Sequence, residues 1–327
     1  MQKAYNPDNM TIGAIAPLEG FVGPVPTMER HVELVQQAEA AGIAQYWVRD
    51  IPLLDPTFGD TGQVFDPFVY LGYLAAVTDS IVLGVASSVL PLRHPLDIAK
   101  AAATVDQLTG GRFTLGIASG DRPVEFPAYG KDHAERGEVF RQSVKYLREA
   151  LGSSFPKINS PLGRLEGADL IPKPVYQKVP LFVTGSSRQN VDWIAQMADG
   201  WLFYTVPLEQ QQLNIRRWRR LTGSRGEPGW KPFNQAIYID LAESPVHLPR
   251  GIHQGLQVGR EPLLELLHAW QGIGVDQLMI NFKQSKRPVA DVLSELKEYI
   301  LPHFPPGSVP SEGVIKPSSG TDMGEEL

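Results

Sequence analysis

The sequence predicts an α/β fold, a (β/α)8 TIM barrel with insertions, as one domain over residues 1–304. Apolar segments of strand length alternate with segments of helical periodicity almost to the end of the chain, which is typical of a parallel sheet with crossover helices. These units approach eight in number, and 327 residues with 43% hydrophobic content suit a single barrel. Small and hydroxyl residues end several predicted strands, at the edge where such folds bind ligands.

The first half of the chain contains four predicted strand–helix units. Thr27 is the expected N-cap of the first helix and Gly42 its end, whereas Pro95 is expected to begin the third helix. The predicted strands are Thr11 to Ala16, Gln45 to Arg49, a segment from Ile81 and Phe113 to Ala118. The apolar faces of the helices are Val32, Val35 and Ala38; the segment Pro67 to Val77; Ile98, Ala102, Val105 and Leu108; and Phe140, Val144, Leu147 and Leu151.

The second half repeats this pattern with longer interruptions. Its predicted strands are Leu181 to Thr184, Trp201 to Tyr204, Ala236 to Asp240 and Gln277 to Ile280. Helices are predicted from about Asn190 to Met197 and from Pro288 onward, the latter with Val289, Val292, Leu293, Leu296 and Ile300 on one face. Residues 153–178 and 242–260 are predicted insertions, the second over the barrel mouth, and residues 305–327 a disordered tail.

Composition excludes several classes of protein. The chain has no cysteine, so it forms no disulfide bond, and we expect it in the cytoplasm. A net charge of −6 disfavours nucleic acid as a partner, and the basic run Arg216 to Arg220 is expected on a solvated helix face. No apolar segment has the length of a membrane span, so no membrane partner is expected.

The loop Gly185-Ser186-Ser187-Arg188 follows a predicted strand and precedes a helix. Its N–H groups, hydroxyls and guanidinium group can converge on an anion such as a phosphate. The alternative is an ordinary β–α turn in which a serine caps the helix. From the residues alone, both interpretations stay open.

Two other strand ends carry polar residues. Ser119-Gly120-Asp121 adds a second small, hydroxyl-bearing end, which makes a ligand cleft more plausible, although Asp121 by itself also fits a turn cap. Arg49 and Asp50 stand where barrel enzymes keep catalytic groups, with an ion pair that orders the loop as the alternative. His94, before Pro95, is expected to be a structural helix cap.

Other catalytic motifs are missing from the sequence. The histidines include no pair at helical metal-ligand spacing, so no protein-bound metal is expected. There is no Gly-x-Ser-x-Gly elbow, no Walker loop and no Gly-x-Gly-x-x-Gly after a strand. Serine hydrolases, P-loop enzymes and Rossmann enzymes therefore lose their main support.

Over roughly residues 10–300, the order of short motifs resembles the luciferase-like flavin-dependent oxidoreductase superfamily. The matching segments are AEAAG (38–42), YWV (46–48), LG (83–84), LPLRHP (90–95), DQLTGGRFTLGIASG (106–120), FPAYG (126–130), PLFVTGSS (180–187) and ADGW (198–201). Each motif is weak alone, but their order is specific. The resemblance implies a luciferase-like (β/α)8 barrel, often a homodimer, that binds reduced FMN, or the deazaflavin F420, at its carboxyl-terminal edge.

The resemblance also assigns cofactor-binding residues. It implies a non-prolyl cis peptide bond between Ala86 and Ser87, beneath the flavin ring. The residues implied at the ring and phosphate are Ala118, Ser119, Gly120 and Asp121, and those of the phosphate loop are Gly185, Ser186, Ser187 and Arg188.

The chain departs from the bacterial luciferases of this superfamily at two positions. Asp50 stands where those enzymes have a catalytic histidine, and Ala118 where they have a reactive cysteine, which argues against light emission from aldehydes. The segment RDIPLLDP (49–56) instead resembles a separate subgroup of luciferase-type oxidoreductases.

These observations favour an FMN-dependent monooxygenase as the function. Reduced FMN would come from a separate flavin reductase, oxygen and a small organic molecule would be the substrates, and Arg49 or Asp50 would face the organic substrate. Two alternatives remain, namely an F420-dependent hydride-transfer oxidoreductase and a flavin-binding protein without turnover. A cofactor-free barrel hydrolase ranks last, because the sequence shows no nucleophile with a base.

Overall fold

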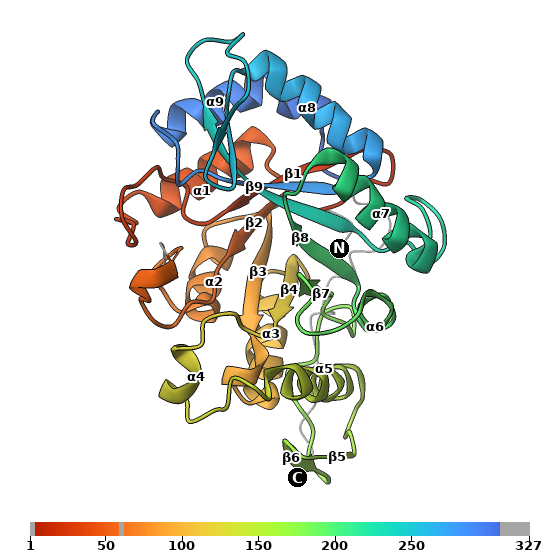
Figure 1. Ribbon diagram of the computed structural model, residues 1–327. Coiled ribbons are helices and arrows are strands. Elements are labelled where there is room, and N and C mark those ends of the chain that lie inside the picture. Colours follow the sequence, from red (N-terminus) through yellow and green to blue (C-terminus); the bar gives the residue numbers. More distant parts are fainter. Residues whose placement is uncertain (1–3, 59–61, 308–327) are drawn as a thin grey trace, which may run out of the picture.

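A computed structural model describes residues 4–58 and 62–307 of the chain, and in it eight parallel strands close into a barrel (Figure 1). Neighbouring strands around the barrel are β1, β2, β3, β4, β7, β8, β9 and β12, and β12 pairs again with β1. The predicted (β/α)8 barrel is therefore confirmed. The strands are β1 (Thr11–Ile15), β2 (Gln45–Val48), β3 (Val82–Val89), β4 (Phe113–Ala118), β7 (Leu181–Thr184), β8 (Gly200–Tyr204), β9 (Phe233–Leu241) and β12 (Gln277–Asn281).

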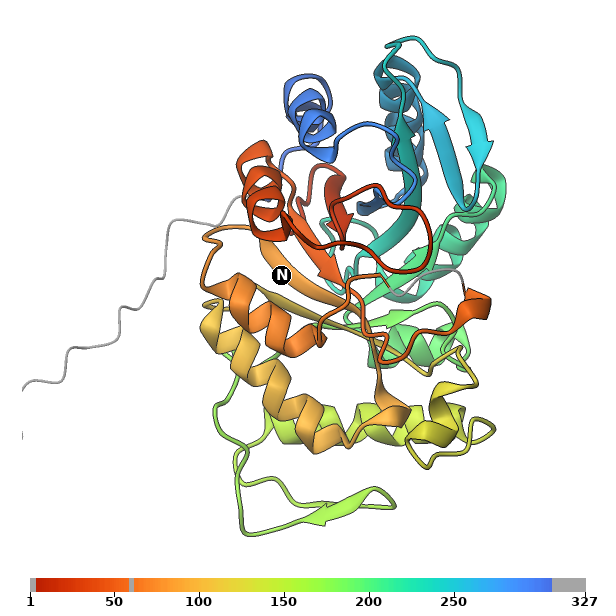
Figure 2. The ribbon, with the colours of Figure 1, turned by 90° about the vertical axis from the view of Figure 1, so that its left-hand side faces the viewer.

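Helices surround the barrel on its outer face (Figure 2). The helices are α1 (His31–Ala41), α2 (Pro67–Ala75), α3 (Pro95–Leu108), α4 (Glu125–Ala128), α5 (Arg136–Gly152), α6 (Val191–Met197), α7 (Leu208–Thr222), α8 (Arg260–Ile273) and α9 (Val289–Tyr299). Three 3-10 turns cover Pro56–Phe58, Leu90–Leu92 and Leu301–His303. As predicted, Pro95 begins α3, with the His94 ring nitrogen accepting a hydrogen bond from the Leu96 N–H at 3.1 Å.

Two hairpins lie outside the barrel, one in each segment predicted as an insertion. The strands β5 (Ile158–Ser160) and β6 (Gly163–Leu165) pair with each other, as do β10 (Arg250–Ile252) and β11 (Gly255–Val258). The two hairpins lie far apart on the molecule in both views (Figure 1 and Figure 2). β11 pairs with residues 238–241 of β9, beyond the part of β9 that pairs with β8, and so extends the sheet at the carboxyl-terminal end of that strand.

Buried side chains fill the amino-terminal part of the barrel. The Trp47 indole N–H donates to Gln277 Oε1 at 2.9 Å, and a Cβ atom at Gly84 would lie 2.5 Å from the Trp47 ring. Tyr5 closes this end, where its hydroxyl accepts a hydrogen bond from the Asn234 amide at 2.7 Å and its ring stacks on Phe182. The interior is therefore a packed core at this end, which leaves the carboxyl ends of the strands as the place for a ligand.

The predicted N-cap of the first helix is wrong. Helix α1 begins at His31, four residues after Thr27, and has no side-chain cap. The Thr27 hydroxyl instead donates to the Glu19 carboxylate at 3.0 Å, and the same carboxylate accepts from the Met28 N–H at 3.2 Å. The Thr27 hydroxyl also accepts from the Glu29 N–H at 3.3 Å, so it orders the turn before α1 and does not reach the first turn of the helix.

The predicted face of α3 needs one correction. Ile98, Ala102 and Val105 are buried, but the Leu108 side chain is 60% exposed. The buried face continues instead to Thr109, whose hydroxyl donates to the Val105 carbonyl at 2.8 Å. Positions 108 and 109 both neighbour Val105, but position 109 lies near the centre of the face formed by Ile98, Ala102 and Val105, whereas position 108 lies at the edge of that face. The apolar character of Leu108 was therefore misleading.

We expect Asp276, directly before β12, to be a main electrostatic support of the barrel. Its side chain is 1% exposed, and it pairs with Arg219, with Arg225 Nε at 2.8 Å and with the Phe233 N–H at 2.7 Å. Asp276→Ala should lower the free energy of unfolding by about 3 kcal/mol or more, because two guanidinium groups lose their counter-charge. Urea unfolding measures this change.

The matched control is Asp192→Ala, which removes an ion pair between exposed side chains of Asp192 and Arg217. It should cost less than about 1 kcal/mol. Equal losses in the two variants would contradict the role assigned to Asp276.

Candidate functional site

A cavity of about 380 Å³ opens at the carboxyl ends of β2, β3, β4 and β7. Among the predicted site residues, those that line it are Arg49, Asp50, Ser87, Ala118, Ser119, Gly120, Asp121, Gly185, Ser186, Ser187 and Arg188. Ala86 does not line it and packs toward the core beside Trp47 and Phe182. Residues from four separate strand ends thus meet in one pocket.

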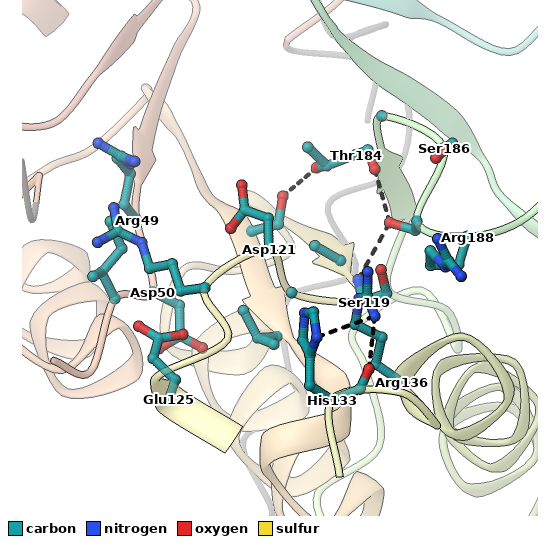
Figure 3. A pocket seen from close by; sticks show the side chains of 18 of the residues that line it. Arg49, Asp50, Ser119, Asp121, Glu125, His133, Arg136, Thr184, Ser186 and Arg188 are labelled. Atoms are coloured by element: carbon teal, nitrogen blue, oxygen red, sulfur yellow. Dashed lines mark hydrogen bonds between the residues drawn. The ribbon is translucent and has the colours of Figure 1, made fainter. Parts of the chain in front are cut away.

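Hydroxyl groups tie three of these strand ends together. The Ser87 hydroxyl is hydrogen-bonded to the Thr184 hydroxyl, which joins β3 to β7. The Ser187 hydroxyl donates to the Thr184 carbonyl at 2.8 Å and accepts from the Ser119 N–H at 3.3 Å, as Figure 3 shows. Both hydrogen bonds of the Ser187 hydroxyl are thus made within the protein. The peptide bond between Ala86 and Ser87 is cis, as the resemblance implies.

The loop from Gly185 to Arg188 has an unusual backbone. Its φ angles are +55° at Gly185, +43° at Ser187 and +62° at Arg188. For residues with a side chain this left-handed conformation costs about 1 kcal/mol, and such strain clusters at ligand sites. The helix cap is Asn190, whose Oδ1 accepts from the Trp193 N–H at 2.8 Å, so the alternative of a serine cap is wrong.

The start of helix α5 packs directly against this loop. A Cβ atom at Gly137 would lie 2.9 Å from Arg188 Cβ, so the absence of a side chain there allows the close approach. The Gln189 amide donates to the Gly137 carbonyl at 2.8 Å, and Arg141 donates to Gln189 Oε1 at 3.0 Å. The start of α5 is thereby fixed against the loop.

One end of the pocket is strongly basic. Burial and the neighbouring Arg188 lower the pKa of Arg136, and burial, Arg136 and Arg188 together lower the pKa of His133. Arg136 Nε and His133 Nε2 are buried and have no hydrogen-bond partner among the described residues. A bound anion would accept hydrogen bonds from these two nitrogen atoms and would reduce the repulsion between Arg136 and Arg188.

The other end of the pocket contains carboxyl groups. Asp50 is 5% exposed and pairs with Arg93 at 2.7 Å, while Ser88 donates to it at 3.1 Å. Burial raises the pKa of Asp50, and Arg93 opposes that rise. The ion pair at the end of β2 thus joins Asp50 to Arg93. The backbone carbonyl of the neighbouring Arg49 accepts a hydrogen bond from the Gln63 side-chain amide at 2.6 Å.

Glu125, in α4, lines the same end. Its side chain is 1% exposed, and burial raises its pKa to about 7, with smaller contributions in the same direction from Asp50, Asp121 and Asp55. Arg122 acts in the opposite direction. At neutral pH the Glu125 carboxyl is therefore partly protonated.

The sequence analysis did not name several residues of the pocket among its candidate site residues. They are Ile51, Phe58, Val89, Arg122, Glu125, His133, Arg136, Thr184 and Tyr204. The run of polar residues after Ser119-Gly120-Asp121 was a usable signal for Glu125. Nothing in the sequence connected the start of α5 to a loop about fifty residues further on.

Two kinds of feature are absent from residues 4–58 and 62–307. No helix there combines the length and apolar character that crossing a bilayer requires. Within the same residues, no group of three or more histidine, aspartate or glutamate side chains is arranged to hold a metal ion.

Residues 10–238 match the family described as luciferase-like monooxygenase. An uncharacterized protein of Mycobacterium tuberculosis is 30% identical over 236 residues, which cover 67% of this chain and 82% of that protein. The alkanal monooxygenase beta chain of Photorhabdus luminescens is 26% identical over 57% of this chain, and the match spans 54% of that protein.

Solved structures share the fold at lower identity. An F420-dependent secondary alcohol dehydrogenase superposes with a TM-score of 0.73 at 17% identity, covering 89% of this chain and 98% of that one. A monooxygenase from Streptomyces bottropensis gives 0.71 at 16% identity, covering 90% and 100%.

Glu125 should make stability depend on pH. Its pKa is near 7 in the folded protein and about 4.5 in the unfolded chain, so between these values only the folded state holds the proton. The stabilisation is complete below pH 4.5 and is lost as pH rises through 7. The unfolding free energy of Glu125→Gln minus that of wild type should therefore rise by about 3 kcal/mol between pH 4.5 and pH 8. The reason is that wild type loses the stabilising proton over this range, whereas glutamine has no proton to lose.

Urea unfolding of both proteins across this pH range tests the expectation. Parallel stability curves for wild type and Glu125→Gln would show that Glu125 titrates like an exposed carboxyl group.

Proposed function

The chain belongs to the luciferase-like monooxygenase family, and on that premise we propose that it is an FMN-dependent oxidoreductase. The reaction would be a monooxygenation that uses reduced FMN and oxygen on a small organic substrate. The observation that carries the proposal is the basic end of the pocket, where Arg136, Arg188 and His133 lie near one another. Ser87, which follows the cis peptide bond, lines the same cavity.

The residues present fit FMN in three respects. Arg136 Nε and His133 Nε2 are buried donors that lack an acceptor among the described residues, which suits a phosphate. Gly120 has a φ of +85°, and a Cβ atom there would lie 2.8 Å from Val89, so this strand end requires glycine and presents only its backbone to a ligand. Ser87 and Ala118 offer small side chains where a flat ring would rest.

Each end of the pocket would have its own task. Arg188, Arg136, His133 and Ser186 would hold the phosphate, whereas Arg49 and Asp50 would face the organic substrate. Bound FMN would supply the electrons for reducing oxygen. The protein would orient the substrate and keep water out of a cavity whose strand ends are locked together by hydrogen bonds.

The second candidate is hydride transfer with F420. It draws on the structural likeness to a dehydrogenase described as F420-dependent, and that cofactor also carries a phosphate for the basic end. The first experiment is therefore a fluorescence titration of the purified protein with FMN, riboflavin and F420. Selective binding of FMN supports the first candidate and preference for F420 the second, while tight flavin binding without any oxidation would indicate a binding protein.

Arg188→Ala should weaken FMN binding by roughly 10- to 100-fold, because a charge-assisted hydrogen bond to the phosphate is lost. Riboflavin has no phosphate, so its affinity should change by less than about 3-fold. Parallel titrations of the variant with both flavins give the two ratios.

Arg216→Ala is the matched control, because Arg216 is exposed on α7 and does not line this pocket. It should bind both flavins as wild type does. Equal losses of FMN and riboflavin affinity in Arg188→Ala would contradict the phosphate assignment.

A further inference from the structure

Glu125 is a buried acidic residue of the pocket that has no role in the proposed binding of phosphate. It lies at the start of α4, lines the cavity and is 1% exposed. Glu125 Oε1 has no hydrogen-bond partner among the described residues. Figure 3 shows its carboxyl group on the same side of the pocket as Asp50 and away from Arg136 and Arg188.

Burial favours the neutral form of Glu125, and the charges around it act in both directions. Arg122 has the largest charge effect and lowers the pKa of Glu125, whereas Asp50, Asp121 and Asp55 raise it. Asp50 is already paired with Arg93, and the Arg122 guanidinium lies 4.6 Å from the centre of the Phe58 ring. A buried carboxyl group among three other carboxyl groups keeps its proton more readily than it would in water.

We propose that Glu125 is a further catalytic residue, the group that gives a proton to the oxygen atom that gains electrons in this pocket. The inference rests on the proposed function in that it needs a reduced flavin or deazaflavin, but it does not depend on which of the two binds. It assigns the substrate to neutral acceptors that carry oxygen, either molecular oxygen or a carbonyl compound.

The proton balance of the reaction leaves one proton to be supplied. A bound reduced cofactor would supply a hydride equivalent to oxygen or to a carbonyl group, and one oxygen atom of the reduced acceptor would then lack a proton. The O–H bond of Glu125 breaks as a new O–H bond forms on the acceptor. The Glu125 carboxylate that remains lies beside Arg122 and takes its next proton from water.

The protonation state of Glu125 matches this task. Burial raises its pKa to about 7, and an acid works best when its pKa lies near the operating pH. Three other titratable side chains of the pocket, Asp50, Tyr204 and His133, are less suitable. Burial also raises the pKa of Asp50, but its carboxyl group is already held in the ion pair with Arg93. Burial raises the pKa of Tyr204, which makes the tyrosine a weaker acid, and lowers the pKa of His133, which disfavours its protonated form.

The first test needs neither cofactor nor substrate. Carbon-13 NMR of protein labelled at the glutamate carboxyl carbons should show one resonance that titrates near pH 7. This resonance should be missing from Glu125→Gln and present in the control Glu209→Gln, because Glu209 is exposed on α7. If every glutamate titrates between pH 4 and pH 5, the inference is overturned, while FMN binding would still support the proposed function.

The second test measures the proton transfer itself. Protein loaded with reduced FMN is mixed with oxygenated buffer, and the formation of hydrogen peroxide is followed. At pH 6, Glu125→Gln should slow this reaction about 100-fold and abolish the decline that wild type shows above pH 7. Glu125→Asp keeps a carboxyl group and should restore part of the rate, and FMN affinity should stay within about 3-fold in all variants.

The outcomes separate the two proposals. If FMN binds and Glu125→Gln changes neither the rate nor its pH profile, the role of Glu125 is overturned and the proposed function stands. If F420 binds instead of FMN, the same comparison is made with reduced F420 and butanone, and the same changes are expected. If neither cofactor binds, the proposed function fails and the catalytic role of Glu125 fails with it.

Discussion

The need to fill the interior of a closed barrel is the constraint on which the rest of this structure depends. Eight parallel strands leave a central space that must be packed, and here Trp47, Gln277, Phe182 and Tyr5 pack its amino-terminal part. Gly84 makes room for the Trp47 ring. Because this end is packed, a ligand has space only at the carboxyl ends of the strands, which is where the cavity lies.

Hydroxyl groups at the edge of the barrel are hydrogen-bonded within the protein, whereas Arg136 Nε, His133 Nε2 and Glu125 Oε1 have no partner among the described residues. Hydroxyl groups of Ser87, Thr184 and Ser187 connect β3, β4 and β7 to one another. This network gives the pocket a fixed floor and leaves the charged side chains around it to act on ligands. Basic groups gather at one end and carboxyl groups at the other, so the cavity can hold a cofactor and a substrate that differ in charge.

Much of the candidate site was predictable, because parallel strands all end at the same edge of the barrel. Residues that directly follow a strand, such as Asp50, Ser119 and Ser186, therefore had to lie near one another. Glu125 and Arg136 were not predictable in this way, since they come from helices that follow long loops. Leu108 and Thr27 were misassigned because residue type was read without knowing what packs against it.

The sequence by itself determined the barrel, the positions of its strands and the edge at which the cavity opens. Burial of one face of a helix or strand produces a periodic pattern of apolar residues, and this pattern can be recognised in the sequence alone. Only the tertiary structure decided that Asp50 pairs with Arg93, that Arg188 meets Arg136, and that Glu125 lies among other carboxyl groups. Ion pairs and pKa values depend on distances between residues far apart in the chain, and those distances exist only once the barrel has closed.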